Sequence, residues 1–82
     1  MAKEIGKVVH FFSKIQVAII ELSAPLKVGD TIKIKGHTTD FEQKVDSIQI
    51  EHQSVQEAKI GDAVGIKVSE HAREDDVAYL VE

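Results

Sequence analysis

The chain has 82 residues, a length that suits one domain with a modest core and excludes two. It contains no cysteine, which excludes disulfide bonds and thiolate metal sites. Ten Lys and Arg residues against fourteen Asp and Glu residues give a formal net charge of −4. This charge argues against an indiscriminate nucleic-acid coat protein, because such proteins need a basic surface. We expect a single domain over residues 1–82.

The N-terminal residues do not resemble a signal peptide. Lys3, Glu4 and Lys7 are charged, and no apolar run of the required length follows them. The longest apolar stretch, 17–20, is far shorter than a membrane span. We therefore expect a cytoplasmic protein that does not associate with a membrane.

The apolar residues recur mostly with a period of two, which is the pattern of a half-buried strand. Ser13-Lys14 predicts a tight hairpin, and Gly29-Asp30 and Gly61-Asp62 predict turns in which Gly has positive φ and Asp bonds the local backbone. Residues 56–59 are expected to form a short helical turn, and no segment favours a long helix. The predicted strands lie near residues 5–12, 15–22, 31–36, 41–52, 63–69 and 77–81.

Two of these segments change phase along their length. Val45 lies on one face of the segment 41–52, whereas Ile48 and Ile50 lie on the other, which predicts a β-bulge at Asp46-Ser47. A similar change within 15–22 predicts a bend, because one apolar set gives way to another: Ile15, Val17 and Ile19, then Ile20 and Leu22. Bends of this kind curl a small sheet and remove its edges. The predicted fold class is all-β, a small closed six-stranded barrel of antiparallel type.

Six segments of the chain carry a pattern that occurs in a known family: residues 5–8, 17–22, 26–32, 34–41, 44–49 and 55–66. Together they resemble the second domain of translational GTPases such as elongation factor Tu. The resemblance covers almost the whole chain, and two Gly-Asp turns with a Val-x-Ser-Ile strand between them make it specific. Two relatives of that domain are more similar still: small stand-alone translation elongation factor-like proteins, and the C-terminal barrel of collagenase-like peptidases, some of which are tied to RNA hydroxylation.

The motifs of an enzyme are missing from the sequence. There is no Gly-rich phosphate-binding loop ending in Lys-Ser/Thr, which excludes nucleotide hydrolysis, and no serine occupies a nucleophile elbow. The acidic run 74–76 predicts a solvated turn before the last strand, with a weak cation site as the alternative. We expect no catalytic activity, no cofactor and no metal, with a minimal metal-dependent hydrolase as a remote alternative. The histidines are scattered without zinc-type spacing: His10, His37, His52 and His71.

The loop before the fourth predicted strand is the first candidate binding site. His37, Thr38, Thr39 and Asp40 place an imidazole, two hydroxyls and a carboxylate on one short connection. Loops held by a rigid scaffold commonly carry binding residues. The alternative is a polar hairpin closed by an Asx-type bond from Asp40. Phe41, which follows, is expected to fill the core or the rim of the barrel.

Three lysines form the second candidate site. Lys33 and Lys35 project from the outer face of one predicted strand and Lys67 from another. Were the strands to bring them together, they would form a local phosphate-facing patch. The alternative is a solvated lysine face that protects a strand edge from aggregation.

Two classes of function follow for a non-catalytic module. The translation-factor resemblance implies a module that binds RNA, either tRNA or rRNA, or a translation-related ribonucleoprotein. The alternative is a protein–protein adaptor or accessory domain for a peptidase-like or RNA-modifying enzyme on another chain. The sequence does not predict the oligomeric state.

Overall fold

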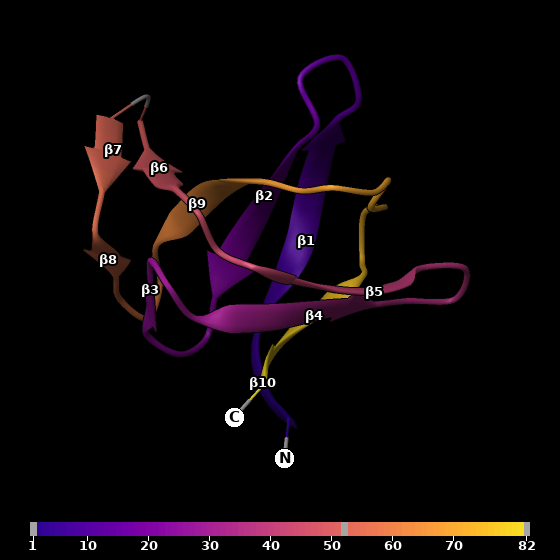
Figure 1. The fold of residues 1–82 in the computed structure, drawn as a ribbon, viewed down its shortest axis with the longest axis horizontal. Coiled ribbons are helices and arrows are strands. Elements are labelled where there is room, and N and C mark those ends of the chain that lie inside the picture. The colour runs from indigo at the N-terminus through magenta and orange to yellow at the C-terminus, as the bar shows by residue number, and fades with distance from the viewer. Residues whose placement is uncertain (1, 52, 82) are drawn as a thin grey trace.

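The computed structural model describes residues 2–51 and 53–81, and these form strands, turns and loops without a helix (Figure 1). None of the described segments is a helix of the length and apolarity that crossing a membrane requires. Eight strands form one antiparallel sheet in the order β5-β4-β10-β1-β2-β9-β6-β7, and β3 pairs with β8 in a second sheet. The strands are β1 (Ala2–Phe12), β2 (Val17–Leu22), β3 (Leu26–Lys27), β4 (Thr31–Lys35), β5 (Asp40–Lys44), β6 (Ile48–Ile50), β7 (Gln53–Val55), β8 (Glu57–Ala58), β9 (Ala63–Lys67) and β10 (Val77–Val81).

The core forms where alternate residues of the curved sheet point inward. Ile32 and Ile34 on β4 and Val64 and Ile66 on β9 are fully buried, as the period-two pattern predicts. Burying each such side chain contributes about 1.5–3 kcal/mol relative to leaving it exposed. The other fully buried large side chains are Ile5, Val8, Ile20, Leu26, Val45 and Ile48.

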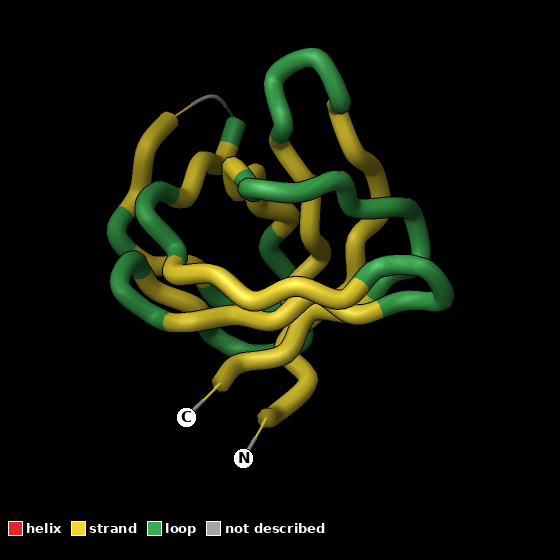
Figure 2. Tube along the Cα trace, turned by 45° about the vertical axis from the view of Figure 1, so that its right-hand side comes forward, coloured by secondary structure: helices red, strands yellow, loops and turns green. Residues whose placement is uncertain are grey.

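Strand β1 is the centre of the sheet and pairs with both β10 and β2. Its register shifts between Glu4 and Gly6 on one side and between Val8 and His10 on the other. Such bulges increase the local twist of a strand. Figure 2 shows the strands curving around the core and the two ends of the chain side by side, consistent with the pairing of Ala2 with Val81.

The predicted closed six-stranded barrel is wrong in its closure and in its strand count. The sheet is open, with β5 at one edge and β7 at the other. The error lies in the segment 41–52, which is divided between β5 and β6. These strands occupy opposite halves of the sheet, so residues 45–47 are a crossing between them and not a β-bulge. Val45 and Ile48, at the two ends of this crossing, are both fully buried.

The predicted bend in 15–22 is also wrong. Ala18, Ile20 and Leu22 alternate regularly into the core along β2, and the irregularity falls on the partner strand β1. Val17 and Ile19 are therefore apolar residues of the outer face. The helical turn predicted for 56–59 is replaced by β8, which pairs with β3.

The two predicted Gly-Asp turns are confirmed, and a third turn of the same kind precedes β10. Gly29 and Gly61 have φ of 100° and 91°. Each turn is closed by a backbone bond between its first and fourth residues and by the aspartate carboxylate, which accepts a hydrogen bond from the first backbone N–H. The carboxylate bonds join Lys27 N to Asp30 Oδ2 at 3.1 Å, Lys59 N to Asp62 Oδ2 at 2.9 Å and Arg73 N to Asp76 Oδ2 at 2.8 Å.

Candidate functional site

The predicted binding loop is the β4–β5 hairpin. Gly36 N donates to Thr39 O at 2.7 Å, and this bond closes the loop. His37 and Thr38 are exposed, whereas Thr39 is buried with 5% of its surface accessible. The carboxylate of Asp40 lies 3.6 Å from Lys33 Nζ, so the described contact is an ion pair in place of the expected Asx-type bond. The loop therefore presents fewer polar groups than the sequence predicts.

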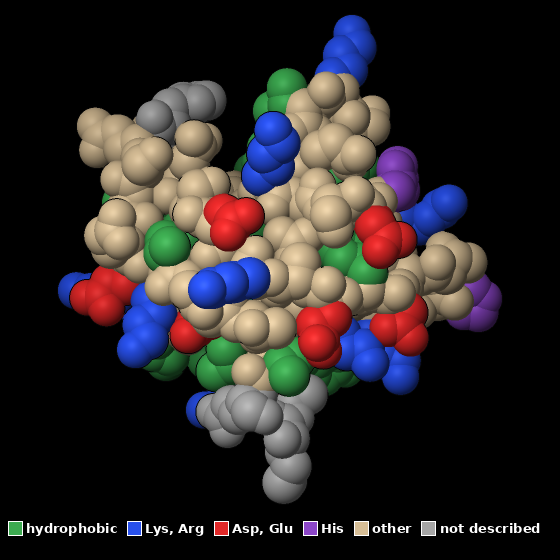
Figure 3. All heavy atoms as spheres, in the orientation of Figure 1, with side chains coloured by type: hydrophobic (Ala, Val, Ile, Leu, Met, Phe, Trp, Pro, Cys, Tyr) green, Lys and Arg blue, Asp and Glu red, His purple; other side chains and the backbone are tan. Residues whose placement is uncertain are grey.

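The three predicted lysines lie on two strands that are not neighbours in the strand order, although the backbone of Lys67 accepts a hydrogen bond from Gln43 of β5, the strand beside β4. Lys33 and Lys35 share one face of β4, where Lys35 stands opposite Asp40 of β5 and Lys33 opposite Glu42. Lys67 lies on β9, with β10, β1 and β2 between it and β4. On the face drawn in Figure 3, acidic and basic side chains are interspersed. RNA contact by these lysines stays a prediction.

The acidic run 74–76 forms a turn, as expected, but it is not wholly solvated. Asp76 is buried with 4% of its surface accessible, and Asp75 lies 3.2 Å from Lys7 Nζ. His10 Nδ1 lies 3.3 Å from Glu74 Oε1. Within residues 2–51 and 53–81, no three His, Cys, Asp or Glu side chains are grouped so that they could hold a metal ion. His52 lies outside the described residues.

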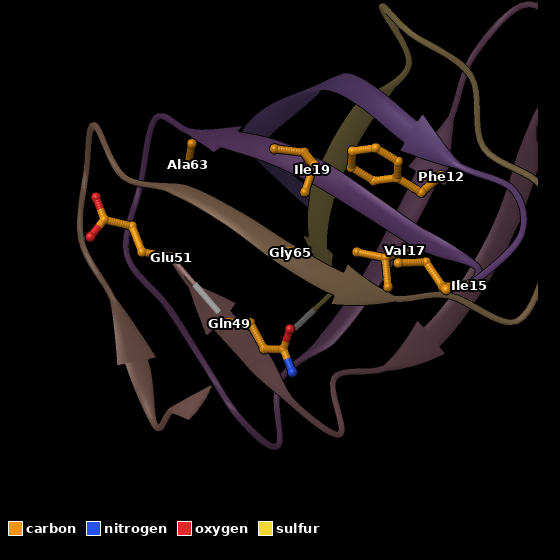
Figure 4. Close-up of a pocket in the computed structure, with 8 residues that line it drawn as sticks. All are labelled: Phe12, Ile15, Val17, Ile19, Gln49, Glu51, Ala63 and Gly65. Atoms are coloured by element: carbon orange, nitrogen blue, oxygen red, sulfur yellow. The ribbon is translucent and has the colours of Figure 1, made fainter. Parts of the chain in front are cut away.

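A groove with an apolar wall lies on the outer face and has a volume of about 360 Å³. It lies between the β1–β2 hairpin and β6, and β9 forms its floor (Figure 4). Figure 3, in the orientation of Figure 1, shows a notch at the top of the molecule between the side that carries β6 and β7 and the side that carries the β1–β2 hairpin. We call this site the outer groove. The residues that line it are Phe12, Ile15, Val17, Ile19, Gln49, Glu51, Ala63 and Gly65.

The depth of the outer groove depends on Gly65. This residue stands opposite Ile19 of β2 and Gln49 of β6. A Cβ added at Gly65 would lie 3.3 Å from Val17 Cγ1 and 3.5 Å from Ile19 Cδ1, and would thus raise the floor between the walls. Glycine weakens a strand interior and often marks a place where another group approaches closely.

The walls of the outer groove differ in polarity. Phe12 and Ile15 on the hairpin side are exposed at 45% and 59%, so this wall presents apolar surface to the solvent. The ring of Phe12 packs edge-on against His10, with ring centroids 4.4 Å apart. On the opposite side, Gln49 and Glu51 contribute an amide and a carboxylate. The groove thus combines an apolar wall with a few polar groups, as binding sites commonly do.

The sequence interpretation missed the outer groove, although a signal for it was present. Ile15, Val17 and Ile19 lie out of phase with the buried residues of β2, so that strand is apolar on both faces. The predicted bend takes this pattern as a place where the sheet curls and removes its edges. An exposed apolar face on a strand whose other face is buried is the alternative reading of the same pattern.

No protein-family model matches the chain. A protease of uncharacterized activity from Methanocaldococcus jannaschii is 51% identical over 79 residues, which cover 95% of this chain and 19% of that protein. A collagenase from Porphyromonas gingivalis is 40% identical over 77 residues, which cover 92% of this chain and 21% of that protein. The chain thus spans about a fifth of the length of the curated relatives it matches.

Solved structures show the same fold. The C-terminal domain of a Geobacillus thermoleovorans protein assigned as a U32 peptidase superposes with a TM-score of 0.91, covering 98% of this chain and 93% of that one at 17% identity. The comparisons overturn the description of the chain as translation elongation factor-like, because the relatives are proteases and a peptidase. The resemblance to the C-terminal domain of collagenase-like peptidases is confirmed. The chain has the fold of a U32-peptidase C-terminal domain, and its homologues are collagenase-like proteases of which it spans about a fifth.

Proposed function

We propose that the chain is a non-catalytic accessory domain that associates with a peptidase-like protein. The observation that carries this proposal is the extent of the match: nearly all of the chain corresponds to 19–21% of each protease relative. A segment of that size leaves about four fifths of those proteins outside the match. Inter-domain contacts of this kind resemble ordinary protein–protein interfaces.

The role of the buried and partly buried acids supports the non-catalytic part of the proposal. Asp30, Asp62 and Asp76 each direct a carboxylate oxygen to the backbone N–H at the start of their own turn. A general acid or base needs a carboxylate that reaches a reacting group. These carboxylates stabilise turns of the scaffold instead.

Affinity capture tests the association. The tagged chain is incubated with a ribonuclease-treated lysate of the organism that encodes it, and the retained proteins are identified by mass spectrometry. We expect one peptidase-like protein to be enriched. A variant with Lys33, Lys35 and Lys67 all replaced by Ala is the matched control, and it should retain the same protein. Retention that requires RNA or the three lysines, or enrichment of no peptidase-like protein, would contradict the proposal.

A cleavage assay tests the absence of catalysis. The purified chain is incubated with denatured collagen and with casein, and the products are followed by gel electrophoresis and mass spectrometry. We expect both substrates to remain intact. Cleavage that persists through repeated purification and differs from that of a mock preparation would show that the chain is itself a peptidase.

A further inference from the structure

We propose that the outer groove is the docking site for an apolar segment that carries a Lys or Arg residue, supplied by the peptidase-like protein. This inference rests on the proposed function and deepens it by naming the surface and the chemistry of its occupant. It is carried by the exposed apolar wall, by the glycine floor and by the charge at one end of the groove.

The apolar wall provides the area to be covered. Ile15 at 59% exposure lies beside Val17, and Phe12 at 45% exposure lies beside Ile19, all at the hairpin side of the groove (Figure 4). Isolated apolar side chains on a surface need no explanation, but several that converge on one hollow mark an interaction site. Binding energy at protein interfaces concentrates where an anchor side chain enters such a pocket.

Strand β9 forms the floor of the groove, and its pairing with neighbouring strands determines how an occupant binds. At Gly65, strand β9 is paired with Ile19 of β2 on one side and with Gln49 of β6 on the other, so strands already flank the floor on both sides. An occupant therefore cannot bind by strand addition at the floor, because strand addition requires an unpaired strand edge. An occupant must insert side chains over Gly65, and the volume of about 360 Å³ lies near the lower end of the ligand-pocket range of about 300–1,000 Å³.

The charge of the groove selects among apolar occupants. Of the residues that line it, Glu51 is the charged one, and it lies at the end of the groove away from Phe12 and Ile15 (Figure 4). Gln49 lies along the same wall and offers both a donor and an acceptor. A segment with apolar residues followed by Lys or Arg would place its cation beside Glu51. Complementary charge gives specificity and orientation to such a contact.

Titration with two synthetic peptides tests this chemistry. The first is acetyl-Ala-Leu-Val-Leu-Ala-Lys-Ala-amide, and the second has Glu in place of Lys. In ¹⁵N-resolved NMR spectra of the chain, we expect the lysine peptide to shift the amides of Ile19, Gln49 and Gly65, with the glutamate peptide binding about fivefold more weakly or worse. Glu51→Lys should reverse this preference. Equal affinities, shifts confined to other surfaces, or no shift at millimolar peptide would overturn the proposal.

A groove-filling substitution tests the site itself. Gly65→Val adds a branched side chain that suits a strand and occupies the space above the floor, so we expect affinity for the lysine peptide to fall about tenfold or more. Lys33→Ala, on β4, is the matched control and should bind normally. Dispersed spectra and a cooperative unfolding transition establish that each variant is folded. If Gly65→Val does not fold, the change of peptide preference in Glu51→Lys tests the proposal by itself.

Repeating the affinity capture separates the two proposals. If Gly65→Val retains the peptidase-like protein as well as the unsubstituted chain does, the association stands and the outer groove is not its site. If the peptides bind with the expected charge preference but no peptidase-like protein is captured, both the proposed function and the proposed occupant are overturned. Concentration-dependent self-association that maps to the outer groove would make the occupant a second copy of the chain and would likewise overturn the proposal.

Discussion

The side-chain amide of Gln43 takes the place of a peptide group opposite Ser69. Gln43 Oε1 accepts a hydrogen bond from Ser69 N at 2.7 Å, and Gln43 Nε2 donates to Lys67 O at 2.8 Å. One amide thus joins the edge strand β5 to the end of β9, where strand pairing would otherwise be needed to close the sheet. The fold remains open in its strand order but is connected across this opening by a side chain.

Removing this connection should destabilise the domain. We expect Gln43→Ala to lower the free energy of unfolding by about 1–2 kcal/mol, since each of the two hydrogen bonds contributes about 0.5–1.5 kcal/mol net. Urea denaturation measures this change, and hydrogen exchange should show faster exchange at Ser69 N. Gln56→Ala, at an exposed position, is the matched control and should change stability by less than about 0.5 kcal/mol. Equal stabilities for the two variants would contradict the bridging role.

The close approach of Gly36 to Asp76 makes a second prediction. A Cβ added at Gly36 would overlap Asp76 Oδ1 and lie 2.6 Å from Asp76 Cγ. Gly36→Ala must therefore displace a buried carboxylate that accepts a bond from Arg73 N, and we expect a loss of about 1–3 kcal/mol. Because the obstacle is the Asp76 side chain, Asp76→Ala should remove most of the extra penalty of Gly36→Ala. Additive effects in this double-mutant cycle would show that the strain lies elsewhere.

The positive φ of Gly61 makes a third prediction. Nothing lies within 4 Å of a Cβ added there, so Gly61→Ala tests backbone strain separately from crowding. We expect a loss of about 1–2 kcal/mol, because an L-residue is strained at φ of 91°. Asp75, at φ of 75° in the equivalent position of the third turn, provides the reverse test. Asp75→Gly should not destabilise the domain beyond the small contribution of its exposed ion pair with Lys7, whereas a loss as large as that of Gly61→Ala would refute the strain argument.

A fourth prediction contrasts two phenylalanines. Phe41 is 6% exposed and Phe12 is 45% exposed. We expect Phe41→Ala to lower the free energy of unfolding by about 3–5 kcal/mol and Phe12→Ala by less than about 1 kcal/mol, because only the first leaves a cavity in the core. Thermal and urea unfolding of both variants measures the difference. A large loss at Phe12 would make it a structural residue and would weaken the case for the outer groove as a binding surface.

Local rules account for the parts of the fold that the sequence predicts well. The Gly-Asp turns at 29–30 and 61–62 depend on neighbouring residues alone, and both are present. The hairpin predicted at 13–14 is present too, but its connection spans residues 13–16 because β2 begins only at Val17. The strands 31–36 and 63–69 were predicted within two residues of β4 and β9 because each buries one regular face. The prediction of one bulged strand over 41–52 was wrong. A change of phase in the apolar pattern is the same for a β-bulge as for a chain that leaves one strand and enters a distant one.

The amino-acid sequence by itself determined that the chain is all-β, that its turns lie at the Gly-Asp pairs, and that β2 is apolar on both faces. Tertiary structure alone decided which apolar face of β2 is core and which is surface. That choice depends on what packs against the strand: Ala18, Ile20 and Leu22 face the other strands of the curved sheet, whereas Val17 and Ile19 face the hollow above Gly65. Closure is decided in the same way, because a contact such as that of Gln43 with Ser69 joins residues 26 positions apart and has no local signature.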